Sequence, residues 1–437
     1  MEQPEEYDVL VIGGGIAGIE SSLTLGDAGY KVLLVEKEPS IGGKMSLLSK
    51  TFPTLDCASC IATPKMAAAA HHPNITLLTY SEVQEVVKNG EADFSVKILK
   101  KPRYVDINAC TGCGDCENAC PVIVSDEFQF DMRGRKAAYI PYDIAVPKKA
   151  VIDIDSCILC GACERVCPAS AIDFTQEAEV LNAKVGAIII ATGFNLSSPE
   201  LRPEFGYGRC KNVITAMQMD RLLAPTRPYN SVLRPLDGKE PMRIAYILCV
   251  GSRDYKVNNP YCSQICCMYS IKQAQLLMGA LPLADITIFY IDIRAFGKGF
   301  EEFYTQAEAM GTIFVKGRVL VVDEDNEGNV IVKYEDINDG GKVKEETFDL
   351  VVLAVGAVPN SDIVKVFKNV KIELDEIGWI KQMDPNNNAV VTSVPGVFAA
   401  GCASGPKDIP DSIVEAGAAA AQCIAYLNEH KYKRKGE

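Results

Sequence analysis

The chain has 437 residues, of which 48% are hydrophobic, and a formal net charge of -13 at pH 7. This length allows two or three domains, and the acidic balance argues against a nucleic acid partner. No apolar run approaches the length of a membrane span, so we expect no transmembrane segment. The chain has seventeen cysteines, and Met1–Pro4 does not resemble the start of a secretory signal. Together these features predict a cytoplasmic protein whose cysteines are reduced and bind metal.

The first predicted element is a buried strand over Tyr7–Ile12, an apolar run rich in β-branched residues. It leads into a G-x-G-x-x-G fingerprint formed by Gly13, Gly15 and Gly18. A helix over 16–28 and a second strand over 31–35 follow, and Glu36 stands where the ribose-binding acid of a dinucleotide fold is expected. Because glycines let the backbone approach a pyrophosphate and the helix N-terminus offers it N–H groups, the segment predicts a Rossmann-type site.

Three segments favour FAD over NAD through their resemblance to glutathione-reductase-like flavoproteins. They are the loop Glu38–Lys44, the strand Ala187–Gly193 with its A-T-G ending, and the strand Val397–Gly401. The aspartate that usually closes the last strand is replaced by Cys402, and an alanine-rich helix over 411–428 follows. The residues that we expect to contact FAD are Gly13, Gly15, Gly18, Glu36, Lys37, Gly43, Lys44, Val83, Thr192, Gly193, Gly401 and Cys402.

Cys57 and Cys60 form a C-x-x-C pair after the flavin loop. The pair is interpreted as a packing feature, as a redox dithiol, or as half of a cluster site that is completed from elsewhere. Lys65, a few residues later, is a candidate for a lysine near the flavin, although a solvated surface position is the simpler interpretation.

Two runs of cysteines lie in a segment that follows the strand-like stretches Thr76–Val87 and Phe94–Leu99. Each run has the C-x2-C-x2-C-x3-C-P spacing of bacterial ferredoxins, in which the fourth cysteine binds the other cluster. Disulfides do not favour this spacing, and zinc sites use paired knuckles instead. We therefore predict two [4Fe–4S] clusters. Cluster one is assigned to Cys110, Cys113, Cys116 and Cys167, and cluster two to Cys157, Cys160, Cys163 and Cys120.

A buried-strand run over Arg243–Val250 lies where flavin disulfide reductases carry a second Rossmann unit for NADPH. No glycine fingerprint follows it, which argues against a nicotinamide site. Four cysteines with the spacing C-x12-C-x3-C-C stand there instead: Cys249, Cys262, Cys266 and Cys267. A non-standard [4Fe–4S] site is the favoured interpretation, a redox dithiol between Cys262 and Cys266 the second, and inert buried cysteines the third.

Taken together, these motifs resemble the HdrA family, the A subunits of heterodisulfide reductases. The matching features are the FAD fingerprint, the segment Thr54–Cys60 followed by Thr63–Met66, the ferredoxin insert and the C-x12-C-x3-C-C site. The resemblance implies that Cys249, Cys262, Cys266 and Cys267 bind a third [4Fe–4S] cluster. It also implies electron relay, or bifurcation at FAD, in anaerobic energy metabolism. Longer family members carry further N- and C-terminal domains, so we expect a short form, of which QmoA of the quinone-interacting membrane-bound oxidoreductase is one kind.

The expected fold class is α/β, a glutathione/thioredoxin-reductase-like FAD-binding Rossmann fold with an inserted 2[4Fe–4S] ferredoxin domain. The expected domains are the FAD-binding domain in three parts (1–100, 174–240 and 346–437), the ferredoxin insert (101–173) and a second Rossmann-like domain (241–345). Expected partners are subunits of an HdrABC-like complex, or of a Qmo-like quinone-interacting complex at the membrane. Ferredoxin, hydrogenase, formate dehydrogenase and a quinone module are the candidate electron partners. The other classes considered are a stand-alone NAD(P)H-dependent flavin oxidoreductase and a scaffold without cofactors.

Overall fold

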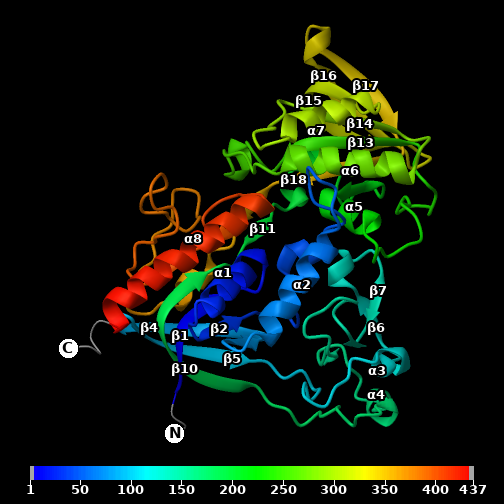
Figure 1. The fold of residues 1–437 in the computed structure, drawn as a ribbon. Coiled ribbons are helices and arrows are strands. Elements are labelled where there is room, and N and C mark those ends of the chain that lie inside the picture. The colour runs from blue at the N-terminus through cyan, green and yellow to red at the C-terminus, as the bar shows by residue number, and fades with distance from the viewer. Residues whose placement is uncertain (1–3, 433–437) are drawn as a thin grey trace. The chain divides into compact units, whose positions relative to one another are not determined.

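A computed structural model describes residues 4–432, and its backbone forms two compact units (Figure 1). Unit 1 comprises Met1–Ser46, Ser59–Phe194 and Pro359–Glu437, and unit 2 comprises Leu47–Ala58 and Asn195–Val358. The cysteine-rich insert therefore belongs to the same compact unit as the glycine fingerprint. The domain ranges given above remain a proposal, because compactness alone does not separate the insert from the flavin part.

Unit 1 is built on a mixed sheet in which the long strand β10 is central. Its strands are β1 (Glu5–Ile12), β2 (Val32–Val35), β3 (Ile75–Leu78), β4 (Ser81–Gly90), β5 (Asp93–Lys100), β10 (Glu179–Ile190) and β20 (Val397–Ala399). The order β3-β2-β1-β10 is parallel throughout. On its other side, β10 pairs antiparallel with β5 over its first half and parallel with β20 over its last residues. Strands buried on both faces explain the continuous apolar runs in β1 and β10.

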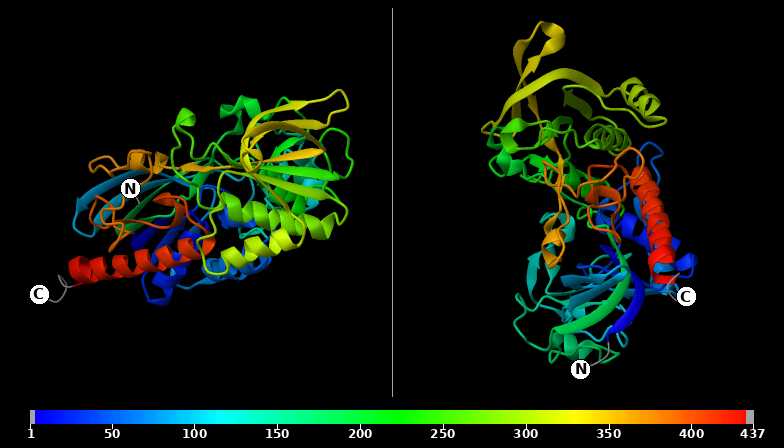
Figure 2. Two further views of the ribbon diagram at one scale, coloured as in Figure 1. Left: turned by 90° about the horizontal axis from the view of Figure 1, so that it is seen from above. Right: turned by 90° about the vertical axis from the view of Figure 1, so that its left-hand side faces the viewer.

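Three helices accompany this sheet: α1 (Ile16–Asp27), α2 (Ala58–His71) and α8 (Ile409–Leu427). Helices α1 and α8 pack side by side, as Figures 1 and 2 show. Helix α8 begins at the N-cap Asp408, whose side chain accepts a hydrogen bond from the Asp411 N–H. The predicted helices over 16–28 and 411–428 correspond to α1 and α8.

The insert is a small, loop-rich region within unit 1. Its elements are α3 (Asp115–Ala119), α4 (Ala162–Val166), and two ribbons, β6 (Ile123–Ser125) with β7 (Gly134–Lys136) and β8 (Ala138–Tyr139) with β9 (Val151–Ile152). Its two ends are tied together, because Asp106 N–H donates to Ala171 O at 2.7 Å and Asp173 N–H to Tyr104 O at 3.0 Å. Its core combines cysteines with small apolar residues such as Ala137 and Ala150.

Unit 2 has a sheet of its own in the order β12-β18-β13-β14-β15-β16-β17. The strands are β12 (Val213–Thr215), β13 (Arg243–Val250), β14 (Asp285–Tyr290), β15 (Ile313–Glu324), β16 (Val330–Asp336), β17 (Lys342–Phe348) and β18 (Leu350–Val355). The first five in the order are parallel, and β15, β16 and β17 form an antiparallel meander. Its helices are α5 (Ala216–Leu223), α6 (Cys266–Ala280) and α7 (Phe300–Ala309).

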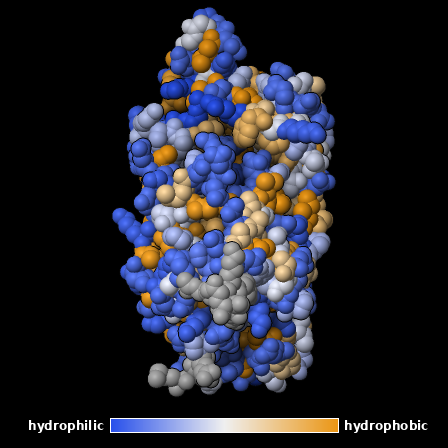
Figure 3. Space-filling model, turned by 60° about the vertical axis from the view of Figure 1, so that its left-hand side comes forward, coloured by the Kyte–Doolittle hydropathy of each residue, from blue (hydrophilic) through white to orange (hydrophobic). Residues whose placement is uncertain are grey.

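The chain passes between the units along β11 (Phe194–Leu196) and β19 (Ala357–Pro359), which pair as a two-stranded ribbon. On the face drawn in Figure 3, hydrophilic residues predominate and hydrophobic ones are scattered among them. Within residues 4–432, no helix has the length and apolar character needed to cross a membrane.

Candidate functional site

The turn between β1 and α1 forms an open cradle at a helix N-terminus. A Cβ added at Gly15 would meet nothing closer than Gly43 Cα at 4.0 Å. Gly15 is the N-cap of α1, no side chain caps it, and the first turn holds no acid. The free N–H groups and the open space fit an anionic pyrophosphate. A Cβ on Gly18 would collide with Gly13 O, so the third glycine lets the helix approach the strand.

Glu36 follows β2 directly and is only 7% exposed. Its Oε2 accepts the Gly14 N–H at 2.6 Å and its Oε1 accepts the Glu38 N–H at 2.9 Å. Burial raises the pKa of the Glu36 carboxyl above its ordinary value, and these two N–H groups oppose that shift. Each carboxylate oxygen keeps a further lone pair for a ribose hydroxyl.

The other predicted contacts fall into two groups, and the first lies around the carboxyl ends of β10 and β20. Thr192 exchanges two hydrogen bonds with Asn360, and no atom lies within 4 Å of a Cβ added at Gly193. Lys44 Nζ lies 4.9 Å from the centre of the Phe194 ring, and burial lowers the pKa of this lysine. Their contact with a flavin stays a prediction.

Gly401 and Cys402 follow β20 in a short turn beside α1. A Cβ on Gly401 would come within 2.8 Å of Ala17 Cβ, which explains the glycine. Cys402 is 9% exposed, and its thiol donates to Lys407 O at 3.3 Å. Lys407, which no sequence pattern indicates, is partly buried beside this turn. Its Nζ donates to Gly401 O at 3.2 Å and lies 3.4 Å from Glu415 Oε2.

The second group of predicted residues has other local partners. Val83 packs in the apolar core of unit 1 from β4. The Lys37 side chain is 64% exposed, and its Nζ is 3.9 Å from Glu38 Oε1. Lys65 Nζ on α2 lies 2.5 Å from Glu20 Oε2 on α1. Their roles toward FAD stay a prediction.

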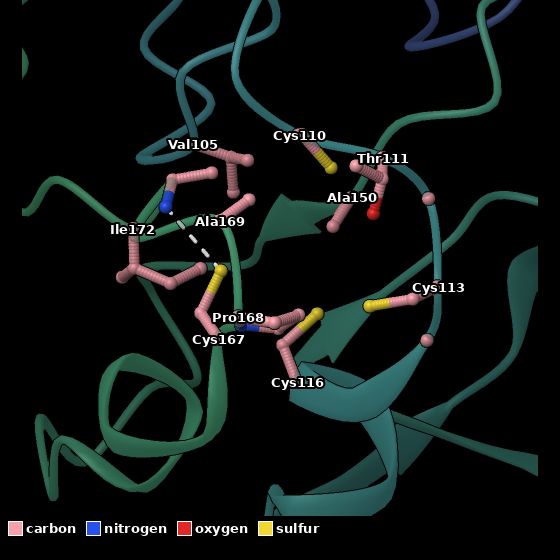
Figure 4. A pocket seen from close by; sticks show the side chains of 13 residues that line it. Val105, Cys110, Thr111, Cys113, Cys116, Ala150, Cys167, Pro168, Ala169 and Ile172 are labelled. Carbon is pink, nitrogen blue, oxygen red and sulfur yellow. Dashed lines mark hydrogen bonds between the residues drawn. The ribbon is translucent and has the colours of Figure 1, made fainter.

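Four cysteines line one pocket of the insert, shown in Figure 4. They are Cys110, Cys113, Cys116 and Cys167, the set predicted for cluster one. Burial is the main cause that raises the pKa of Cys116 to about 12, and the nearby Cys110 and Cys113 thiols add to the shift. A cube of iron and sulfide would supply the positive charge that four close thiolates need.

The set predicted for cluster two lies across α3 and α4, which pack together. Cys163 is buried, and burial together with the thiols of Cys157 and Cys120 raises its pKa. Cys160 is exposed. All four are free thiols, as are the cluster-one cysteines.

No three His, Cys, Asp or Glu side chains within residues 4–432 are grouped so that they could hold a single metal ion. A [4Fe–4S] cube does not require such a group, because each cysteine binds a different iron. The pocket in Figure 4, with thiols on several sides, therefore fits a cluster better than a lone ion.

The third cysteine set gathers at the end of β13 and the start of α6. The β13–β18 register shifts between Ile247 and Val250, and Cys249 in this irregularity has φ 62°. Such bulges re-aim side chains and are frequent beside functional sites. Cys266 and Cys267 open α6, whose N-terminal end favours negative charge. The residue pattern alone did not reveal the bulge.

The thiols of this set affect one another electrostatically. Burial raises the pKa of Cys249 to about 12 and that of Cys267 to about 11, with neighbouring thiols of the set adding to both shifts. Beside them, Asp292 Oδ1 accepts hydrogen bonds from Arg253 at 2.6 Å and from Arg294 at 3.1 Å. A metal cluster in this place would supply positive charge and so favour the thiolate form of its ligands.

Cys57 and Cys60 are both disulfide-bonded, and the other fifteen cysteines of the chain are free. Of the three interpretations offered for this pair, the disulfide agrees with a redox dithiol in its oxidised form. Its role stays a prediction.

Three family models match parts of the chain. A 4Fe-4S dicluster domain matches residues 106–171, an FAD dependent oxidoreductase matches residues 8–59, and a pyridine nucleotide-disulphide oxidoreductase matches residues 285–420. FAD and [4Fe–4S] clusters are thereby confirmed as the cofactors. The individual contact residues and the third cluster remain predictions.

Curated relatives match nearly the whole chain. The second of the iron-sulfur A subunits of CoB–CoM heterodisulfide reductase from Methanopyrus kandleri is 50% identical over 96% of this chain and 64% of its own length. The corresponding A subunit from Methanocaldococcus jannaschii is 49% identical over 95% of this chain and 64% of its own. The A subunit of the H(2):CoB-CoM heterodisulfide,ferredoxin reductase from Methanothermobacter thermautotrophicus is 46% identical, covering 94% and 63%. The chain thus spans less than two thirds of these relatives.

Solved structures show the fold. The thioredoxin reductase of T. acidophilum superposes with a TM-score of 0.55 at 17% identity, covering 97% of this chain and 99% of that one. The thioredoxin reductase of Lactococcus lactis gives 0.54 at 16%, with the same coverage. With the dicluster match, the predicted thioredoxin-reductase-like fold with a ferredoxin insert is confirmed.

Proposed function

The chain is a homologue of the HdrA family, and on that premise we propose that it is the iron–sulfur flavoprotein subunit of a multi-subunit oxidoreductase of the heterodisulfide reductase type. Its role would be to relay electrons between FAD and [4Fe–4S] clusters. Bound FAD would take up electrons in pairs and release them singly, whereas each cluster passes one.

The observation that carries this proposal is the pocket lined by Cys110, Cys113, Cys116 and Cys167 in the same compact unit as the glycine cradle. Gly15 leaves room for the pyrophosphate, Glu36 would bind the adenosine ribose, and the α1 N-terminus would balance the phosphate charge. Electron transfer between a cluster and a flavin needs the two sites to lie close together, and unit 1 contains both.

Partner subunits are proposed because the relatives are named as subunits of reductases. The exposed Cys160, with Ile158 and Leu159 each 64% exposed, offers a cluster-two ligand at the surface for an external electron carrier. Which protein donates or accepts those electrons is a matter for co-purification.

The test is the cofactor content of the anaerobically purified full chain. We expect one FAD and about twelve irons if all three [4Fe–4S] sites fill, or about eight if only the insert binds clusters. EPR of the reduced chain should show the clusters. A chain that holds neither flavin nor iron would contradict the proposal.

The residues of unit 2 argue against the alternative function, that of a stand-alone NAD(P)H-dependent flavin oxidoreductase. Ser252 and Arg253 follow β13, where fingerprint glycines would clear space for a pyrophosphate. The Ser252 hydroxyl lies 2.9 Å from the Ser263 hydroxyl, and Arg253 is fixed on Asp292. Rapid bleaching of the flavin by NADH or NADPH in stopped-flow absorbance, without partner subunits, would favour this alternative.

A further inference from the structure

The insert is fastened to the flavin loop by a compact group of hydrogen bonds. The Ser40 hydroxyl lies 2.8 Å from the Tyr142 hydroxyl and accepts the Val146 N–H at 2.8 Å. The Ile41 N–H donates to Val146 O at 3.0 Å, and the Tyr142 hydroxyl also donates to Ile41 O. We call these four residues, Ser40, Ile41, Tyr142 and Val146, the junction.

On its inner side the junction touches the glycine cradle. A Cβ on Gly14 would come within 2.5 Å of Ile41 Cγ2, so the Ile41 side chain lies directly against this glycine. The Gly42 N–H donates to Gly14 O at 2.8 Å, and a Cβ on Gly43 would come within 2.9 Å of Gly15 Cα. The junction therefore packs directly against the glycine cradle.

On its outer side the same segment reaches the cluster-one pocket. The Lys149 ammonium donates to the carbonyl of Cys110, and a Cβ on Gly112 would collide with Lys148 O. Ala150, the next residue, lines the pocket with the cysteines (Figure 4). The segment 142–150 therefore contacts the flavin loop at one end and the backbone that carries Cys110 and Cys113 at the other.

A second contact strengthens the attachment from the start of the insert. Arg103 is 6% exposed and donates to Pro39 O and Thr79 Oγ1, each at 2.6 Å. Its own carbonyl accepts the Ile152 N–H at 3.0 Å. In contrast, the cluster-two loop presents Ile158, Leu159 and Cys160 to solvent.

We propose that cluster one, and not cluster two, is the cluster of the insert that exchanges electrons with FAD, and that Tyr142 and Ser40 are the positioning residues that hold it there. The inference rests on the proposed function, because it needs both cofactors. When bound, a reduced cluster one would give the flavin one electron at a time, and two such electrons with two protons from water would complete the reduction of the flavin. An external one-electron donor would reduce cluster one again.

The first test replaces Tyr142 with phenylalanine, which keeps the ring that stacks on Phe128 at 4.6 Å and removes only the hydroxyl. The full chain is mixed with titanium(III) citrate as one-electron donor, and cluster and flavin bleaching are followed separately. Flavin bleaching should slow several-fold, because the rate of electron transfer falls steeply as donor and acceptor move apart. Iron content and FAD content should stay unchanged, so that a slower rate reports the position of the cluster and not the loss of a cofactor.

Tyr139→Phe is the matched control, since Tyr139 lies against Arg135 in the same insert and outside the junction. It should leave the flavin bleaching rate unchanged. An unchanged rate in Tyr142→Phe and in Ser40→Ala, at full cofactor content, would overturn the positioning role.

The second test asks which cluster serves the flavin. In Cys160→Ser the remaining insert cluster and the flavin should bleach together. In Cys113→Ser the remaining cluster should bleach first, while the flavin bleaches only at the direct titanium rate, which is measured in the variant that carries both changes. The opposite order would overturn the assignment of cluster one. Missing FAD or iron in the unaltered chain would contradict the proposed function instead, so the two failures are distinct.

Discussion

Each compact unit contains a strand–turn–helix segment at an equivalent place in its sheet. The turn in unit 1 lacks side chains, whereas the turn in unit 2 carries cysteines. In unit 1, β1 runs into Gly13–Gly15 and then α1, which leaves open space at an uncapped helix N-terminus. In unit 2, β13 ends in an irregularity that carries Cys249, and α6 opens with Cys266 and Cys267. Both turns would suit a negatively charged group: a phosphate in the first, and in the second the thiolates that the protein itself would provide to a cluster.

The two turns show which features each kind of ligand would require. A phosphate needs the backbone to approach closely, so side chains must be absent. A cluster would need side chains to converge, and unit 2 brings the thiols of Cys249, Cys262 and Cys267 close enough to affect one another. Helix N-termini stabilise both anions by the same dipole. The following predictions test whether the two turns are as independent as this comparison says.

The largest effect is expected from Gly15→Val, which should abolish FAD binding. Gly15 has φ -75° and ψ -176°, a conformation that any residue adopts. Backbone strain therefore does not contribute to the loss of FAD binding. The valine side chain would instead fill the cradle that the pyrophosphate needs. The measurement is flavin released on denaturation, together with the cluster EPR signal, which should persist because the insert carries its eight ligands.

Gly90→Val is the control, because Gly90 at the end of β4 also has open space but lies outside the cradle. It should retain FAD. Full FAD occupancy in Gly15→Val would show that the dinucleotide binds elsewhere, and the comparison would lose its first half.

The replacement of Cys266 and Cys267 by serine should remove one cluster and leave the others. Iron should fall by about four from about twelve, since each [4Fe–4S] cube holds four irons. The FAD content should not change if the two turns are independent. Cys210→Ser, at a buried lone thiol of the same unit, should lose no iron. Iron near eight in the unaltered chain would refute the third cluster.

What the sequence could predict follows from how local each signal is. The fingerprint glycines, Glu36 and the two ferredoxin runs are short patterns whose spacing is set by the ligand, so the fold class and cofactors were predictable. The hydrogen bond between the Ser40 and Tyr142 hydroxyls joins residues about a hundred positions apart, so no local sequence pattern predicts it. The irregularity at Cys249 depends on the pairing of β13 with β18, which is also a tertiary feature.

A second difference between the two units lies in which residues their helices bury. Helix α1 buries small and apolar residues such as Ala17 and Leu25, whereas α6 buries Lys272, which is 1% exposed. Its Nζ donates to both oxygens of Asp220 and to Lys50 O, each at 2.9 Å. Such a pair holds the segment Leu47–Ala58 to α5 and α6 within unit 2.

Lys272→Met should therefore destabilise the protein by about 3–5 kcal/mol, because Asp220 would be left as a buried charge without its cation. Chemical denaturation measures the loss, and Lys298→Met, at an exposed lysine of the same unit, should change stability little. Adding Asp220→Leu to Lys272→Met should recover part of the loss. A stability equal to that of the unaltered chain would mean that the pair does not hold the segment.

The smallest effect is expected from Glu36→Gln, which asks how much of FAD affinity depends on the acid rather than on the open turn. The amide keeps one acceptor oxygen, so one of the two backbone N–H groups that Glu36 accepts from, at Gly14 or Glu38, would lose its partner. A buried donor without a partner costs about 1–3 kcal/mol, part of which would appear as weaker FAD binding. Titration of the apoprotein with FAD measures it, and Glu38→Gln at the exposed neighbour should leave the affinity unchanged. A Glu36→Gln affinity equal to that of the unaltered chain would assign the binding to the cradle alone. The contrast with unit 2 would then be complete. The turn in unit 1 would bind its ligand only because it has no side chains in the way, whereas the turn in unit 2 would bind a cluster through its cysteine side chains.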